Sequence, residues 1–98
     1  MAENVYQGRL IRRLRRQFPG CVILKNDTSY IQGIPDLSVF DGANWAWLEV
    51  KDHENAPQQP NQDYYVELAD RWSFGSFIYP ENEEDVIYAL QQTFGSRR

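Results

Sequence analysis

Hydrophobic positions recur along the chain with two different periods, and the change of period separates helices from strands. Near the N-terminus, apolar residues between Tyr6 and Phe18 recur at spacings of three and four, which is typical of a helix with one buried face. Shorter apolar runs bounded by Gly, Pro, Asn and Asp are typical of strands. The pattern predicts a helix at about 3–18, strands at 21–25, 37–40 and 45–51, a helix from about 60 to 72, a strand at 74–79 and a last helix between 82 and 95.

Turn residues support this division of the chain. A Pro-Gly pair at 19–20 ends the first helix, and residues 41–44 (Asp-Gly-Ala-Asn) suit a hairpin between the second and third strands. Asn82 is a natural N-cap for the last helix, and Gly95 is a natural end for it. The order of helices and strands predicts an α/β fold, and the absence of a long linker predicts a single domain over residues 1–98.

Composition excludes several classes of protein. With 42% hydrophobic and 24% charged residues among 98, the chain has the balance of one globular domain and not of a disordered segment. No apolar run is long enough for a membrane helix or a signal peptide, so we expect a cytosolic protein. The single Cys21 excludes an internal disulfide, and its apolar neighbours predict a packed thiol in a buried strand. With only His53 beside it, it also excludes the usual cysteine and histidine zinc site.

Charge is distributed unevenly along the chain. The net charge of −4 argues against an indiscriminate binder of polyanions, since such proteins gain affinity by releasing counterions through many basic residues. Acidic residues gather late in the chain, at Glu81 and from Glu83 to Asp85. The side of the first helix opposite its apolar face is basic and can meet phosphates. It carries Arg9, Arg12, Arg13 and Arg16 as candidate DNA contacts, with Arg15 beside them.

Two polar residues interrupt the apolar face of the first helix. At about 100° per residue, Glu3 and Gln7 fall in the middle of the face that Tyr6, Leu10 and Phe18 form. A carboxylate in a frayed first turn is favoured by the helix dipole and needs no further role. This feature alone therefore leaves a structural and a functional interpretation open.

A second departure lies in the third strand. Because side chains alternate along a strand, Glu49 and Lys51 project side by side, away from its apolar face. A solvated ion pair would explain these two residues alone. Asp36, however, lies thirteen residues before Glu49, at the start of the strand that the hairpin pairs with it, where its carboxylate can reach Glu49. A turn shaped by Gly33 and Pro35 and capped by Asp36 would explain these three residues by themselves. It would not explain why they occur together with Glu49 and Lys51.

Converging carboxylates would give these residues a shared chemistry. Glu3, Asp36 and Glu49 would form a hard, oxygen-rich site that suits Mg²⁺ or Mn²⁺ rather than Zn²⁺. An ion held by Asp36 and Glu49 would bind a phosphate oxygen and lower the pKa of a bound water. Lys51 would orient or help to deprotonate that water and offset charge on the reacting phosphate. The predicted chemistry is phosphodiester hydrolysis.

The full set of residues resembles the PD-(D/E)xK nuclease superfamily, in which Pro35-Asp36 and Glu49-x-Lys51 would be the defining motif. The resemblance implies a restriction-endonuclease-like core, helix-β-β-β-helix-β-helix, with a mixed sheet flanked by helices. The fuller pattern is similar to the VRR-NUC branch over nearly the whole chain. Its small stand-alone members, many from bacteriophages, resemble Holliday junction resolvases. The matching segments are Glu3 with Gln7, Gly33-x-Pro35-Asp36-Leu37, Leu48-Glu49-Val50-Lys51, and Gln62 at the start of the second helix.

The resemblance implies a role for each matching side chain. Asp36 and Glu49 would bind Mg²⁺, for which Mn²⁺ could substitute. Lys51 would be catalytic, and Glu3 would be a supporting acid and third metal ligand. Gln62 would position the site, although from the edge of its helix face it could instead cap the helix.

Other residues keep an open assignment. Gln7 would support Glu3 from behind. Lys25, Asn26 and Asp27 could line the site or belong to an ordinary loop, and no role is assigned to His53.

These features favour a magnesium-dependent DNA endonuclease, acting on branched DNA as a Holliday junction resolvase does. No element resembles a major-groove reader, so we expect selection of DNA shape. Paired cuts in a four-way junction predict a homodimer, with interface candidates among the aromatic residues. A monomeric nicking or flap-type nuclease, a non-catalytic nucleic-acid-binding domain and a protein-binding acidic edge are the alternatives. The implied location is the cytoplasm of a bacterial cell, with a host or phage gene. The aromatic residues that include candidates for the dimer interface are Trp45, Trp47, Tyr64, Tyr65 and Trp72.

Overall fold

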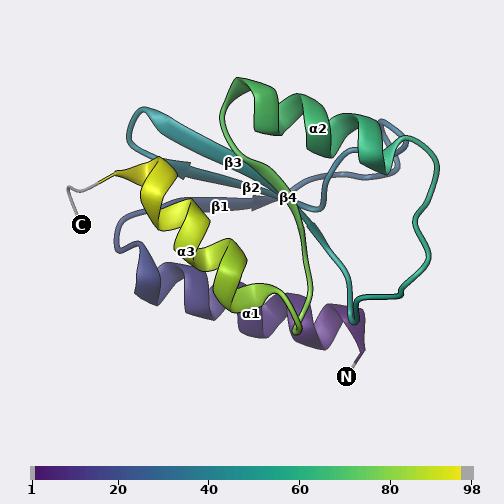
Figure 1. Ribbon diagram of the computed structural model, residues 1–98, viewed down its shortest axis with the longest axis horizontal. Helices are drawn as coiled ribbons and strands as arrows, with labels where there is room; N and C mark the ends of the chain where they lie inside the picture. The colour runs from purple at the N-terminus through teal and green to yellow at the C-terminus, as the bar shows by residue number, and fades with distance from the viewer. Residues whose placement is uncertain (1, 96–98) are drawn as a thin grey trace.

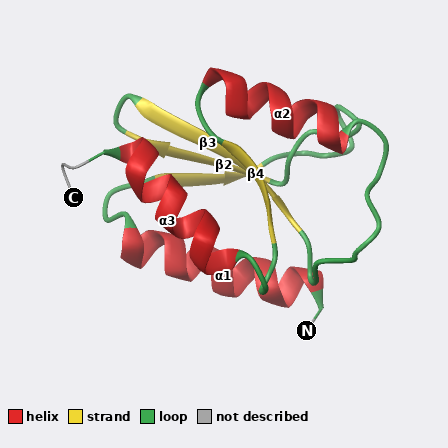
Figure 2. Ribbon diagram, viewed as in Figure 1, coloured by secondary structure: helices red, strands yellow, loops and turns green. Residues whose placement is uncertain are grey.

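The computed structural model describes residues 2–95 and has the α/β architecture expected from the sequence. A four-stranded mixed sheet lies between helices that cover its two faces (Figures 1 and 2). Within the described residues, no helix is both long and apolar enough to cross a membrane. The elements follow the predicted order: α1 (Glu3–Gln17), β1 (Val22–Lys25), β2 (Leu37–Asp41), β3 (Asn44–Val50), α2 (Gln62–Trp72), β4 (Gly75–Ile78) and α3 (Glu83–Phe94).

The sheet has the strand order β1-β2-β3-β4. The first two pairs are antiparallel, whereas β3 and β4 are parallel. Asp41 pairs with Asn44, so Gly42 and Ala43 form the hairpin turn, with Gly42 at a φ of 65°. The hairpin predicted at residues 41–44 is therefore confirmed. The parallel pair of β3 and β4 needs a crossover connection, which α2 supplies (Figure 1).

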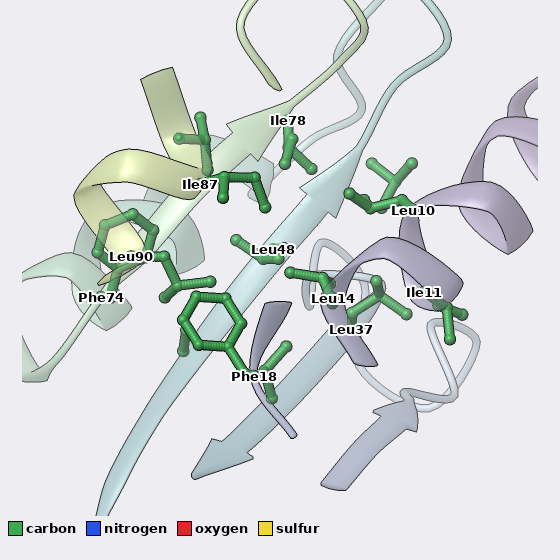
Figure 3. Close-up of a cluster of buried hydrophobic side chains, with 14 of the residues drawn as sticks. Leu10, Ile11, Leu14, Phe18, Leu37, Leu48, Phe74, Ile78, Ile87 and Leu90 are labelled. Atoms are coloured by element: carbon green, nitrogen blue, oxygen red, sulfur yellow. The ribbon is translucent and has the colours of Figure 1, made fainter. Parts of the chain in front are cut away.

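One face of the sheet carries the hydrophobic core. α1 and α3 cover this face, and α2 covers the other (Figure 1). Side chains from α1 and α3 meet those of the strands in one continuous cluster (Figure 3). Tyr6, Leu14 and Phe18 are fully buried, and the Phe18 ring meets Phe94 edge to face with 5.2 Å between centroids. This packing holds α1 along the sheet, and its first turn lies near the end of β3.

Polar contacts also join α1 to α3. The Arg13 guanidinium donates hydrogen bonds to the carboxylates of Glu83 and Glu84, at 2.8 Å for Glu84. The Tyr6 hydroxyl donates to Glu83 Oε1 at 2.7 Å, and the Arg9 guanidinium lies 5.4 Å from the centroid of the Tyr6 ring. The basic and acidic clusters, far apart in the sequence, therefore neutralise each other in part.

The strand predicted at residues 21–25 forms as β1, but the prediction that it is buried is wrong. β1 is an edge strand, and its Val22 and Leu24 side chains are 54% and 51% exposed. They lie on the face that α2 covers, but α2 packs on β3 and β4 and leaves β1 open. Cys21 is partly buried against the core, as expected for a packed thiol.

The expectation that Asn82 caps α3 is also only partly right. Asn82 directly precedes the helix, but its side chain makes no capping hydrogen bond. Its Oδ1 accepts from Tyr79 N at 2.9 Å, and its Nδ2 donates to Phe77 O at 3.0 Å. The side chain therefore ties the connecting turn to β4 instead.

A glycine allows α2 to approach the sheet closely. A Cβ atom on Gly75 would lie 2.8 Å from Ala69 Cβ and would collide with the Val66 carbonyl oxygen. Packing at this point fixes the C-terminal half of α2 over β3 and β4, and thereby the direction of the helix that begins with Gln62.

Gly75→Ala is expected to lower the free energy of unfolding by about 2 kcal/mol or more, because the new methyl group collides with the α2 backbone. Gly8→Ala is the control, since the nearest atom to its Cβ position is on the Arg12 side chain at 3.7 Å. That change should stabilise α1 by roughly 0.5–1 kcal/mol. Urea denaturation measures both effects, and equal stability of Gly75→Ala and wild type would contradict the close packing.

Candidate metal centre

Three elements bring one carboxylate each to the same place. Glu3 is the first residue of α1, Asp36 directly precedes β2, and Glu49 is the next-to-last residue of β3. Leu37 pairs with Leu48, so Asp36 and Glu49 lie at adjoining strand ends. One carboxylate oxygen from each acid lies within 4.8 Å of the others. The three acids singled out in the sequence thus converge in space.

Backbone contacts hold Asp36 in this position. Its Oδ2 accepts a hydrogen bond from Val50 N at 2.9 Å, and its carbonyl oxygen accepts one from Asn26 N at 2.8 Å. The residue is therefore tied to both neighbouring strands, and its carboxylate points along the end of the sheet toward β3.

Glu49 is buried, with 2% of its surface exposed. Its Oε2 accepts from Gln62 Nε2 at 2.8 Å, whereas its buried Oε1 has no hydrogen-bond donor within residues 2–95. Burial, together with the negative charge of Asp36, raises the pKa of Glu49 to about 8. The same two causes raise the pKa of Glu3. A buried carboxylate oxygen without a donor calls for a proton or a cation.

Lys51 lies beside the acids and is 7% exposed. Its Nζ donates to Gln62 Oε1 at 2.8 Å and to Pro57 O at 3.0 Å, and it lies 3.7 Å from Glu49 Oε2. The Gln62 amide therefore bridges the lysine and the glutamate. Gln62 Oε1 also accepts from Gln59 N, so the residue holds the turn before α2 as well as the site.

Gly33 sets the position of the loop at residues 26–35. Its φ is 91°, and a Cβ atom there would lie 2.5 Å from Asn61 Cβ and 2.8 Å from Pro60 O. The loop backbone thus packs directly on the residue before Gln62, beside the first turn of α2 (Figure 1). A larger residue at this position would separate the two walls of the site.

A polar cavity of about 510 Å³ opens at the three carboxylates. Its wall includes Asp52 and His53, and His53 Nδ1 lies 2.6 Å from Asp52 Oδ1. No sequence pattern pointed to Asp52 as part of the site, and its one signal is that it directly follows Lys51. The rest of the wall comes mainly from the loop before β2 and the segment after β3: Thr28, Gln32, Ile34, Ala56, Pro57 and Gln59.

Several candidate residues lie elsewhere. Gln7 is partly buried on α1, one turn from Glu3, but is not in the cavity wall. Lys25 is exposed at the end of β1 and lies outside the wall too. Asn26 and Asp27 line a separate hollow on the other side of their loop.

The arginines of α1 divide into two groups. Arg9, Arg12, Arg15 and Arg16 are exposed and are not among the residues of the cavity wall. Arg13 differs because Glu83 and Glu84 bind its guanidinium. It therefore joins two helices and is not free to meet a phosphate in this arrangement.

The donor atoms fit a hard divalent cation. All three converging groups offer carboxylate oxygens, which Mg²⁺ and Mn²⁺ prefer, and the donor-free Oε1 of Glu49 is one of the buried atoms at the site. Comparison with known proteins does not extend this picture: no protein-family model, curated protein or solved structure matches the chain.

The raised pKa of Glu49 predicts how stability depends on pH without metal. The folded protein holds this proton up to about pH 8, whereas the usual carboxyl value is 4.5, so stability falls as pH rises between these values. Glu49→Gln keeps the shape without the charge, so at pH 8.5 in EDTA it should be more stable than wild type by roughly 1–3 kcal/mol.

Urea denaturation across pH in EDTA measures this difference, which should vanish near pH 4.5. Glu67→Gln, which removes an exposed carboxylate of α2, is the matched control. A constant difference between wild type and Glu49→Gln at all pH values would contradict the interpretation.

Proposed function

We propose that this chain is a metal-dependent endonuclease that hydrolyses phosphodiester bonds in DNA, with a restriction-endonuclease-like core similar to the VRR-NUC branch of the PD-(D/E)xK superfamily. The order of the elements supports this proposal, because Asp36 directly precedes β2, Glu49 lies near the end of β3, and Lys51 directly follows β3. The observation that carries the proposal is the convergence of Glu3, Asp36 and Glu49 within 4.8 Å beside the buried Lys51.

Asp36 and Glu49 would hold Mg²⁺, or Mn²⁺ in its place, with Glu3 as the third carboxylate. When bound, such an ion polarises a phosphate oxygen and lowers the pKa of a nearby water. Val50 N holds the Asp36 carboxylate, and the Gln62 amide holds that of Glu49. Both ligands are therefore oriented in advance, which reduces the reorganisation needed during the reaction.

Lys51 would supply positive charge where the reacting phosphate becomes more negative. An ammonium group has three N–H donors, and the bonds to Gln62 Oε1 and Pro57 O occupy two of them. The third is left to donate to the phosphate or the attacking water. These bonds hold the ammonium beside the carboxylates, so little rearrangement is needed for its charge to act on the phosphate.

The substrate would be DNA of unusual shape. Arg9, Arg12 and Arg16 are the proposed phosphate contacts, which position a strand but do not read sequence. The net charge of −4 disfavours tight binding to any duplex. Phosphate contacts without a major-groove reader favour selection of DNA shape, and branched DNA, as for a Holliday junction resolvase, is the proposed substrate.

Paired cuts in a four-way junction need two centres and hence a homodimer. The uncovered half of the sheet offers an apolar surface for it. Val22, Leu24 and Phe40 are exposed there and share one face by the β1–β2 register. A protein that stays monomeric would instead fit a nicking or flap-type nuclease.

Cleavage of a synthetic four-way junction tests the proposal. Wild type should make symmetric pairs of nicks with Mg²⁺ or Mn²⁺ and none in EDTA. Lys51→Ala should cut about a hundredfold more slowly or worse, because the charge beside the phosphate is lost. Lys25→Ala removes an exposed lysine outside the cavity and should keep the wild-type rate.

The same gel assay includes linear duplex, a flap and single-stranded DNA. Equal cutting of duplex or flap would retain the nuclease and refute junction specificity. Failure to cut any substrate with either metal would refute the nuclease. Salt-sensitive DNA binding would then favour the non-catalytic nucleic-acid-binding domain.

A further inference from the structure

A second hollow, of about 260 Å³, lies on the other side of the loop that walls the metal cavity. Both hollows use this loop: Thr28, Gln32 and Gly33 line the metal cavity, and Ile34 lines both. The two spaces are therefore neighbours, separated by a few residues of one segment. The second hollow is lined by Asn26, Asp27, Tyr30, Ile31, Ile34 and Trp47.

We propose that this hollow binds an unpaired nucleobase of the strand whose phosphate lies in the metal cavity. The inference rests on the proposed function and specifies its substrate, because a base enters such a hollow only when it is unstacked from its neighbours.

Two aromatic side chains, Tyr30 and Trp47, line the hollow. Tyr30 is 84% exposed, which leaves the side chain of a large residue in water at the mouth of the hollow. Trp47 is held by an edge-to-face contact with Tyr65, at 6.4 Å between ring centroids. One exposed ring and one fixed ring at a single hollow suit stacking with a base, which is how proteins hold unpaired nucleotides.

The charge of Asp27 makes the hollow more suitable for a base than for a phosphate. Asp27 Oδ1 accepts hydrogen bonds from Ser29 N and Ser29 Oγ, at 3.0 and 2.6 Å. These bonds lower the pKa of Asp27, so its carboxylate stays charged. A negative group repels a phosphate, but it accepts hydrogen bonds from the amino groups of bases.

The loop is also fixed before any ligand arrives. Asn26 Nδ2 donates to Pro35 O at 2.8 Å, and Asn26 Oδ1 accepts from Ser38 Oγ at 2.9 Å. These two bonds span the loop from its first residue to β2. A preformed hollow loses little entropy on binding, which favours a small rigid ligand such as a base.

Fluorescence of 2-aminopurine tests this inference. The probe is a DNA fork with 2-aminopurine at the unpaired nucleotide next to the branch, and Ca²⁺, which also takes oxygen ligands, replaces Mg²⁺. Wild type should quench the fluorescence by stacking. Tyr30→Ala should lose the quenching and bind the fork roughly 5- to 100-fold more weakly, with unchanged binding of a fully paired duplex.

Two variants serve as controls. Tyr30→Phe keeps the ring and should behave as wild type, and so should Tyr88→Ala, which removes a tyrosine that is 65% exposed on α3. Wild-type quenching and affinity in Tyr30→Ala would overturn the base site, as would equal loss of fork and duplex binding. Because quenching does not require cleavage, a protein that quenches through Tyr30 but cuts no DNA would refute the nuclease and retain the base site.

Discussion

Mutual repulsion among three carboxylates is the constraint on which the arrangement of this protein depends. Oxygen atoms of Glu3, Asp36 and Glu49 come within 4.8 Å of one another. Burial first, and then the negative charge of Asp36, raise the pKa of Glu49, so both desolvation and repulsion oppose a charged carboxylate there. Each acid comes from a different element, and each element is anchored elsewhere. The site can therefore keep a geometry that an isolated loop would relax.

The contacts that anchor the elements lie away from the site, which forms where the elements begin or end. Buried α1 residues such as Leu14 hold Glu3 from one side, and the contacts of Arg13 with α3 add to this support. The close approach at Gly75 fixes α2, whose first residue, Gln62, links Glu49 to Lys51. Core packing thus positions the polar groups without taking part in their chemistry.

Local signals made much of this predictable from the sequence. Helix periodicity and turn residues define the elements, and the short hairpin sets the register that brings Asp36 beside Glu49. Features that depend on contacts between distant segments were not predictable. The sequence of an apolar strand such as β1 does not show whether the strand lies at an edge of the sheet or in a buried position. Nor does the sequence show that α3 packs across α1 and that Glu83 binds Arg13. The hollow at Tyr30 likewise exists only once its loop folds back over β3.

Calorimetric titration with Mn²⁺ at pH 7, in two buffers of different ionisation enthalpy, tests the central claim that the three acids form one divalent metal site. Since Glu49 has a pKa of about 8, binding should release about one proton. Asp36→Asn should abolish binding, and Asp27→Asn, in the neighbouring hollow, should leave it unchanged. Absence of binding by the wild type, or binding that persists unchanged in Asp36→Asn, would contradict the account.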